Sequence, residues 1–299
     1  MIKNILHKVN LIWNGIILYN LLNLKKTTPV ILSLNSTMEK LCNSNKSIAR
    51  FGDGEFNMIL GKGNGFQKYE ENLGKRLLEI LSSDIEDQCM VALPWFEDSS
   101  LKLHAKLYWR TIYPNYRKLL ERVCTRHGYA NSFITRPYMD FDNLEQSRYV
   151  FEKFKDILRE KRVLIVEGEG TRFGVGNTLL SNVKLVGRLL CPNINAFSHY
   201  NEIYDFIRDN ASKYDLVLIA LGPTATVLCW ELSKYGVRAI DIGHLDIEFF
   251  WMNNGCQKKA PVPGKNVNEL GMVGDSTELS TEYSSSIIRK IMPKKESNL

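Results

Sequence analysis

Residues Arg162–Asn177 read Arg-Val-Leu-Ile-Val-Glu-Gly-Glu-Gly-Thr-Arg-Phe-Gly-Val-Gly-Asn, and this stretch decides the fold class. Its apolar run Val163–Val166 is typical of a strand that is buried on both faces of a parallel sheet. The four glycines at positions 168 to 176 let backbone N–H groups approach a phosphate closely. Because ligands of parallel α/β sheets bind outside the carboxyl ends of the strands, the stretch predicts such a sheet with an anion-binding turn.

From Ser47 onward, short apolar runs alternate with longer segments of helical periodicity. We therefore expect a Rossmann-like α/β fold with a mainly parallel sheet and helices on both faces. The predicted strands are Ser47–Phe51, Met90–Leu93, Ser132–Thr135, Arg162–Val166, Leu185–Leu190, Leu216–Leu221 and Arg238–Ile242. The predicted helices are Tyr69–Ser82, Lys102–Cys124, Asn143–Glu160, His199–Asn210, Thr224–Tyr235 and Asp246–Asn253.

The composition divides the chain into three parts. Residues 1–45 are predicted to form a helical extension, and residues 46–256 carry the α/β pattern. Residues 257–299 are polar and rich in Gly, Pro and Ser, so we expect a poorly packed tail or a flap there. The whole chain, with 44% apolar and 24% charged residues, has an ordinary globular composition, which excludes disordered and collagenous proteins.

The positive charge of the chain is concentrated at its ends. Residues 1–26 contain four lysines and no acidic residue, whereas residues 27–256 are neutral, so a nucleic-acid partner is not expected. The run Leu11–Leu24 is too short for a spanning helix, and no cleavage site of small residues follows it. Two interpretations of residues 1–26 stay open: peripheral contact with a membrane, or packing on the body or a second subunit. The six widely spaced cysteines indicate a cytoplasmic protein, with the inner face of the membrane as an alternative site.

A carboxylate pair follows the first predicted strand. Asp53 and Glu55 are alternate residues on a glycine-rich turn, so they can converge on one divalent cation and leave its other positions to phosphate oxygens. Arg50 precedes this turn and can bind a phosphate through two N–H groups, and Gly52 allows close approach of the backbone. An ordinary Asp-Gly turn has the same sequence, so the motif alone leaves both interpretations open.

The glycine-rich turn supplies a second set of candidate ligand-binding residues: Arg172, Gly174, Gly176 and Asn177. If the backbone at Gly176 contacts a nucleotide, Gly176→Val should abolish binding without unfolding the protein. The Walker pattern is absent, which argues against a P-loop NTPase. The turn is also similar to that of methyltransferases and dehydrogenases, but the next strand ends in Cys191-Pro192, with no acidic residue to hold a ribose. A loop that binds no ligand is the remaining alternative.

A third set of candidates lies at two other strand ends. Gly222, Pro223 and Thr224 begin a predicted helix whose N-terminal N–H groups favour an anion, although simple capping explains the threonine equally well. Arg136 follows a further predicted strand.

The last predicted strand leads into three residues that can act as a general base or metal ligand: His244, Asp246 and Glu248. Structural roles are equally open for them, because Asp246 can cap a helix and Glu248 can complement its dipole. Together, the strand-end residues fit a nucleoside diphosphate with a divalent metal better than a neutral metabolite.

Five motifs of this chain, in the same order, resemble those of the GT-D fold glycosyltransferases, formerly a bacterial domain of unknown function. They are Arg50-Phe-Gly-Asp-Gly-Glu55 with Gly61 and Phe66-Gln67, Arg172-x-Gly-Val-Gly-Asn177, Asn195-Ala-Phe197, Leu221-Gly-Pro-Thr-Ala225 and Ile240-Asp-Ile-Gly-His244. The resemblance covers about Ser47 to Glu269. It does not extend to the N-terminal 40 residues or the last 25 or so.

The resemblance implies a metal-dependent enzyme that moves a hexose, glucose or galactose, from a UDP-sugar to a glycan or glycoprotein of the bacterial surface. In that family the Asp-x-Glu motif, here Asp53 and Glu55, is associated with the metal, Mn²⁺ or Mg²⁺, and the donor diphosphate. The acceptor hydroxyl needs a base, for which Asp246 is the first choice and Glu248 or His244 the reserves. Two alternatives stay open: a non-catalytic nucleotide-binding subunit of a glycosylation complex, and an S-adenosylmethionine-dependent methyltransferase.

Overall fold

The computed structural model describes residues 29–83, 87–124, 128–267, 270 and 280–292. The predicted helix within residues 1–26 lies outside the described residues. The helices are α2 (Leu34–Cys42), α3 (Asp53–Ile59), α4 (Glu71–Ser82), α5 (Leu103–Val123), α6 (Leu144–Leu158), α7 (Tyr200–Asn210), α8 (Pro223–Ser233), α9 (Leu245–Asn253) and α10 (Thr281–Ser286), with 3₁₀ helices η1 (Ser132–Thr135), η2 (Ala196–His199) and η3 (Ala211–Lys213). The strands are β1 (Ser47–Arg50), β2 (Cys89–Leu93), β3 (Ala130–Asn131), β4 (Arg162–Gly168), β5 (Leu185–Cys191), β6 (Leu216–Ala220), β7 (Ala239–Asp241) and β8 (Ile287–Lys290).

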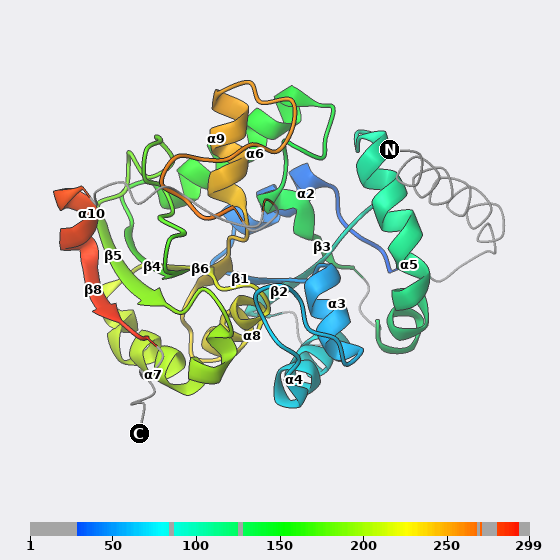
Figure 1. Ribbon diagram of the computed structural model, residues 1–299, viewed down its shortest axis with the longest axis horizontal. Coiled ribbons are helices and arrows are strands. Elements are labelled where there is room, and N and C mark those ends of the chain that lie inside the picture. Colours follow the sequence, from blue (N-terminus) through cyan, green and yellow to red (C-terminus); the bar gives the residue numbers. More distant parts are fainter. Residues whose placement is uncertain (1–28, 84–86, 125–127, 268–269, 271–279, 293–299) are drawn as a thin grey trace.

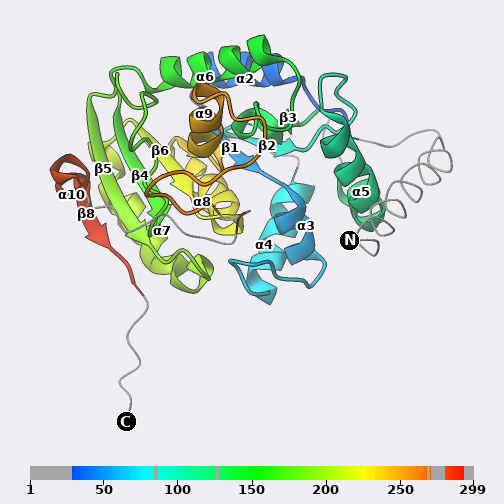
Figure 2. The same cartoon turned by 45° about the horizontal axis from the view of Figure 1, so that its top comes forward.

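The eight strands form one sheet in the order β3-β2-β1-β7-β6-β4-β5-β8. Every pair of neighbouring strands is parallel, so all carboxyl ends meet at the same edge of the sheet. Helices α2 and α6 lie on one face, and α4, α7 and α8 lie on the other (Figures 1 and 2). The predicted α/β fold with a parallel sheet is therefore confirmed.

Strand β4 illustrates why the fold needs helices on both faces. Val163 and Ile165 pack into the core on the side of α2 and α6, whereas Leu164 and Val166 pack into the core on the side of α7 and α8. All four side chains are fully buried, because successive residues of a strand point to opposite faces. The continuous apolar run in the sequence is the consequence of this two-sided burial.

The predicted strand Ser132–Thr135 is wrong, because these residues form η1. Strand β3 consists only of Ala130 and Asn131, after which the chain leaves the sheet. The Asn131 side chain explains the change, since its carbonyl oxygen accepts a hydrogen bond from the Phe133 N–H at 3.0 Å and so starts a turn. The apolar residues of η1 are buried in the core beside α2 and α9, so a 3₁₀ turn can bury the same apolar side chains as a strand.

The prediction of a poorly packed tail is wrong for residues 281–290. They form α10 and β8, and β8 pairs with β5 at the edge of the sheet (Figure 1). Its sequence, Ile-Ile-Arg-Lys, is too short and too charged to be recognised as a strand. Ile287 is half-buried and the other three residues are exposed, as expected for an edge strand. None of the described helices is both long and apolar enough to cross a bilayer.

A buried ion pair joins this C-terminal segment to the glycine-rich turn. Arg188 on β5 binds Glu167 on β4 at 2.7 Å, and both side chains are almost completely buried. Arg188 also donates to the Phe173 carbonyl at 2.9 Å and to the Ser286 hydroxyl at 3.0 Å. The Tyr283 hydroxyl donates to Glu167 at 3.3 Å, so α10, the sheet and the turn share one network.

We expect Arg188→Met to lower the free energy of unfolding by about 3 kcal/mol, because it leaves the Glu167 carboxylate buried without its charged partner. Arg289→Met on β8 is the matched control, since its pair with Glu202 is half-exposed and contributes less than about 1 kcal/mol. Urea unfolding of both variants checks the difference. Equal losses would show that the buried pair has no special role in stability.

Candidate functional site

A cavity of about 750 Å³ lies at the carboxyl ends of the strands. Its floor is formed where β1, β7 and β6 end, by residues that include Arg50, Asp241 and Gly222. On one side of β1 lie β2 and β3, which form one half of the sheet with it. On its other side, β7 begins the half that contains β6, β4 and β5. The cavity therefore opens between the two halves of the sheet, which is where open α/β sheets bind their ligands.

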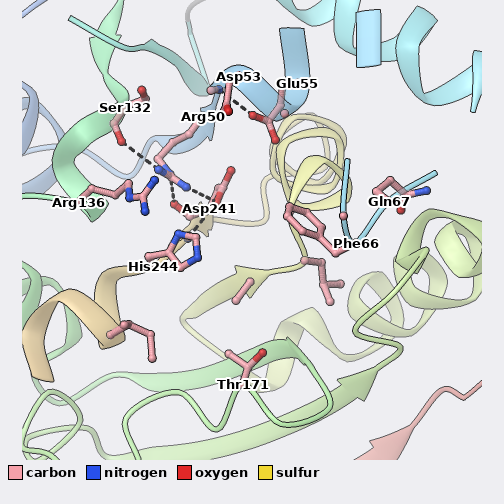
Figure 3. A pocket seen from close by; sticks show the side chains of 18 of the residues that line it. Arg50, Asp53, Glu55, Phe66, Gln67, Ser132, Arg136, Thr171, Asp241 and His244 are labelled. Carbon is pink, nitrogen blue, oxygen red and sulfur yellow. Dashed lines mark hydrogen bonds and ion pairs between the residues drawn. The ribbon is translucent and has the colours of Figure 1, made fainter. Parts of the chain in front are cut away.

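Arg50 is fixed in the floor by three hydrogen bonds. Its Nε donates to the Asp241 carbonyl at 2.9 Å, its Nη2 to Asp241 Oδ1 at 3.1 Å and its Nη1 to the Ser132 carbonyl at 2.9 Å (Figure 3). Burial raises the pKa of Asp241, and the Arg50 charge opposes this rise. Gly243 has a φ of +43°, and a side chain there would collide with the Arg50 guanidinium. A guanidinium has five N–H donors, so Arg50 retains donors for an anion in the cavity.

The predicted carboxylate pair lies in the first turn of α3, and both residues line the cavity. Glu55 Oε2 accepts a hydrogen bond from the Gly52 N–H at 2.7 Å, and Asp53 Oδ2 accepts one from the Tyr108 hydroxyl at 2.5 Å. Burial, together with the charge of Asp241, raises the pKa of Glu55 to about 7. The local field is therefore unfavourable to a second negative charge and would favour a bound cation.

The carboxylate pair suits a divalent cation that is held mainly by its substrate. Among the described residues, no group of three or more His, Cys, Asp or Glu side chains can enclose a metal ion. Mg²⁺ and Mn²⁺ in nucleotide enzymes commonly use one or two carboxylates, and take the other ligands from phosphate oxygens and water. The Asp53 and Glu55 carboxylates both line the cavity and supply oxygen ligands, so the donor set fits such an ion.

The glycine-rich turn contributes Gly168, Thr171 and Phe173 to the cavity. Figure 3 shows Thr171 on the opposite side of the cavity from Arg50. The predicted residues Arg172, Gly174, Gly176 and Asn177 are not among those that line it. They determine instead the shape of the turn, since Arg172, Gly174 and Gly176 all have a positive φ.

Asp246 holds the glycine-rich turn in place. Its Oδ1 accepts hydrogen bonds from the Gly174 N–H at 2.9 Å and from the Asn177 amide at 2.6 Å. Its Oδ2 forms a buried ion pair with Lys265. Asp246 lines the cavity as predicted, but three donors occupy its carboxylate, which favours a positioning role.

The end of the segment that follows α9 lies against the glycine-rich turn. Asn266 donates from its backbone N–H to the Gly170 carbonyl at 2.9 Å and from its side chain to the Glu169 carbonyl at 3.1 Å. Lys259 and Asn266 line the cavity, so part of the predicted tail belongs to the site. The polar composition of this segment gave no signal for such a role.

The start of α8 is packed closely by an aromatic ring. Gly222 has a φ of +54°, and a side chain at this position would collide with Phe66, which also lines the cavity. The loop that carries Phe66 is fixed by Asn195, whose N–H donates to the Phe66 carbonyl at 2.8 Å. Pro223 and Thr224 are buried and do not line the cavity.

The remaining candidates after β7 have different surroundings. His244 lies at the N-terminus of α9 and lines the cavity. Glu248 is completely buried outside the lining, and its Oε2 accepts hydrogen bonds from the backbone N–H groups of Tyr138 at 3.0 Å and Met139 at 2.7 Å. Burial raises the pKa of Glu248 to about 7. Arg136 lines the cavity beside Arg50 (Figure 3).

Helix α5 forms one side of the cavity, a contribution that the residues at the strand ends did not predict. His104, Ala105, Tyr108 and Trp109 from its first turns line the cavity, together with Asp140. His104 and Tyr108 are four residues apart and lie on one helix face. The sequence did contain a signal for this side of the cavity. Polar and aromatic residues repeat at this spacing along a helix, and the other face of that helix is apolar.

The parallel sheet with a polar cavity over its carboxyl ends is the arrangement in which α/β proteins bind their ligands. The family model described as "Glycosyltransferase GT-D fold" matches residues 48–270. The chain therefore belongs to the GT-D fold glycosyltransferase family, as its motifs indicated.

Relatives of this chain include two streptococcal proteins. "Glycosyltransferase GlyD" of Streptococcus pneumoniae is 32% identical over 265 residues, which cover 88% of this chain and 32% of that protein. "Probable glycosyl transferase Gly" of Streptococcus gordonii is 33% identical over 241 residues, which cover 80% of this chain and 35% of that protein. The chain thus spans about a third of the length of these curated relatives.

Solved structures share the fold. A structure of the domain of unknown function 1792, described as a distinct glycosyltransferase fold, has 34% identity and a TM-score of 0.85, and the match covers 89% of this chain and 96% of that one. A DUF1792 glycosyltransferase from Streptococcus sanguinis has 32% identity and a TM-score of 0.84, with 88% and 100% covered.

We expect Gly176→Ala to lower the free energy of unfolding by about 1 kcal/mol, because φ is +73° there and a Cβ would meet no neighbour. Gly174→Ala should lose about 1 kcal/mol more, since φ is +76° and its Cβ would also collide with Leu180. Urea unfolding of both variants measures the difference. A larger loss at Gly176 would contradict this description of the turn.

Proposed function

We propose that this chain transfers a hexose, glucose or galactose, from a UDP-sugar to a glycan or glycoprotein acceptor with the help of Mn²⁺ or Mg²⁺. The observation that carries the proposal is the convergence of Asp53, Glu55 and Arg50 on one cavity at the carboxyl ends of the strands. Family membership supports sugar transfer, and the donor set supports the choice of a diphosphate-bearing donor.

The residues around the floor suggest how the donor diphosphate is held. Asp53 and Glu55 would hold the cation, which would neutralise charge on the departing UDP. Arg50 would donate hydrogen bonds to a phosphate oxygen from a guanidinium that Asp241 and Ser132 already orient. Because these groups are fixed before the donor binds, little reorganisation is required during transfer.

His244 is the best candidate for the base that accepts the proton of the acceptor hydroxyl. It lines the cavity, and an imidazole ordinarily titrates near neutral pH, which suits proton transfer. Asp246 is occupied by Gly174, Asn177 and Lys265, so we assign it to positioning the turn. Glu248 lies outside the lining of the cavity and holds the backbone near Met139.

We also propose that the enzyme works in the cytoplasm. All six cysteines have free thiols, as is typical of a reducing compartment. Residues 1–26, with their four lysines, would contact the inner face of the membrane or a second subunit. The acceptor would then be a glycan or glycoprotein of the bacterial surface that is assembled inside the cell.

Removing either carboxylate should weaken UDP binding only when metal is present. We expect Asp53→Asn and Glu55→Gln to bind UDP with Mn²⁺ as weakly as wild type does with EDTA, as measured by calorimetry. Hydrolysis and transfer of the UDP-sugar should fall at least ~100-fold, because charge stabilisation at a leaving group contributes roughly 3 kcal/mol.

Glu71→Gln is the matched control for this experiment. Glu71 is an exposed carboxylate on α4, paired with Lys75 and outside the cavity, so its loss should change neither quantity. If EDTA leaves the UDP affinity of the wild type unchanged, or if both site variants transfer sugar normally, the metal assignment is wrong. A chain that binds UDP with metal but releases none from any UDP-sugar would be a non-catalytic subunit.

The base assignment predicts a change in the pH profile. His244→Asn should lower kcat by about 100-fold or more and remove the limb on which activity increases as pH rises, because only the unprotonated imidazole accepts a proton. Asp246→Asn should instead weaken UDP binding and destabilise the fold, since it releases the glycine-rich turn. A loss of kcat in Asp246→Asn with unchanged UDP affinity, together with an active His244→Asn, would make Asp246 the base.

A further inference from the structure

The cavity has two walls of different chemistry. One wall lies over β4 and β5 and consists of backbone and small polar groups, such as Gly168, Thr171 and Asn193. The other wall is the N-terminal part of α5, which follows β2 at the opposite end of the sheet order. Figure 2 shows α5 and β5 at opposite ends of the molecule. The wall over β4 and β5 suits a nucleotide, whereas the α5 wall has a different chemistry.

The α5 wall presents an aromatic surface. The Tyr108 side chain is 48% exposed and lies edge-on to Trp109, with ring centroids 5.7 Å apart. Trp109 is 8% exposed and packs in turn against Phe133, so the support behind Tyr108 is rigid. Aromatic rings have a negative face that attracts polarised C–H groups, and pyranose rings carry such groups on their less polar face.

A polar pair stands beside this aromatic surface. His104 Nε2 lies 3.5 Å from Asp140 Oδ1, and the exposed fractions of these side chains are 63% and 14%. His104 lies one helical turn before Tyr108, so the imidazole and the phenol face the same space. Asp140 offers hydrogen-bond acceptors and His104 offers a donor or an acceptor, which matches the hydroxyl groups of a neutral sugar.

The α5 wall also touches the groups assigned to the donor. The Tyr108 hydroxyl donates to Asp53 at 2.5 Å, so a ligand on this wall lies next to the proposed metal and diphosphate. A hydroxyl that attacks the donor sugar must reach the anomeric carbon, which is bonded to that diphosphate. The location is therefore suitable for the acceptor and too close to Asp53 for a second, unrelated ligand.

We propose that Tyr108, His104 and Asp140 form the acceptor subsite, which takes a neutral pyranose at the end of a glycan. The pyranose ring stacks on Tyr108, while its hydroxyl groups bind Asp140 and His104. This assignment rests on the proposed sugar transfer, and it adds the chemical class of the acceptor and the residues that select it. An anionic sugar is disfavoured, because the Asp140 carboxylate stands beside Tyr108 and His104 in the lining of the cavity.

The test measures binding of p-nitrophenyl glycosides of glucose, galactose, N-acetylglucosamine and N-acetylgalactosamine by saturation-transfer NMR, with and without UDP and Mn²⁺. We expect at least one glycoside to bind the wild type through its ring protons. Tyr108→Ala, His104→Ala and Asp140→Asn should each weaken it about tenfold, because the first removes the stacking ring and the other two remove or weaken a hydrogen bond to a sugar hydroxyl. Tyr108→Phe should retain most of the affinity, because it keeps the ring and loses only the bond to Asp53.

Leu103→Ala is the matched control, since Leu103 precedes His104 on α5, is 71% exposed and does not line the cavity. It should bind the glycosides as the wild type does. The subsite is refuted if no glycoside binds a wild type that binds UDP, or if the three weakening variants bind within twofold of wild type. If glycosides bind as expected but neither UDP binding nor UDP-sugar hydrolysis is found, the subsite holds and the proposed donor fails.

Discussion

The site depends on the contact between Arg50 and Asp241, because it fixes the carboxyl ends of β1 and β7 and the start of η1 relative to each other. Neither residue could be buried alone without a large loss of hydration energy. Together they form an ion pair, and Thr226 donates a further hydrogen bond to the Arg50 carbonyl at 2.8 Å. The junction between the two halves of the sheet is therefore polar but rigid, and the cavity is built around it.

Much of the fold could be predicted because burial on both faces leaves a direct trace in the sequence. Apolar runs such as Val163–Val166 and Leu216–Leu221 identified the central strands, and their order along the chain indicated a parallel sheet. Elements at the periphery left a weaker trace. Helix α3 is short, β8 is charged, and η1 has the apolar pattern of a strand while Asn131 turns it into a 3₁₀ helix.

The candidate site was predicted where side chains follow strands, and was missed where they come from other elements. Arg50, Gly52, Asp53, Glu55 and Gly222 all line the cavity, because strand ends converge in any parallel sheet. His104, Asp140 and Lys259 also line it, but their places depend on how α5 and two loops pack. Asp246 could be predicted because it follows a strand. Its partners could not, because Gly174 and Asn177 lie 72 and 69 residues before it in the sequence and Lys265 lies 19 residues after it. Such partners are not visible in a local pattern.

The position of β8 has a consequence for how the protein behaves in solution. A parallel sheet that ended at β5 would expose a row of unpaired N–H and C=O groups along seven residues, Leu185–Cys191. The chain covers part of that row with its own segment, whose exposed residues include two that are charged: Arg289, which pairs with Glu202, and Lys290. At the other end, β3 has only two residues to offer. Both edges are thereby poor templates for further strands, which protects the folded protein from aggregation through its sheet edges.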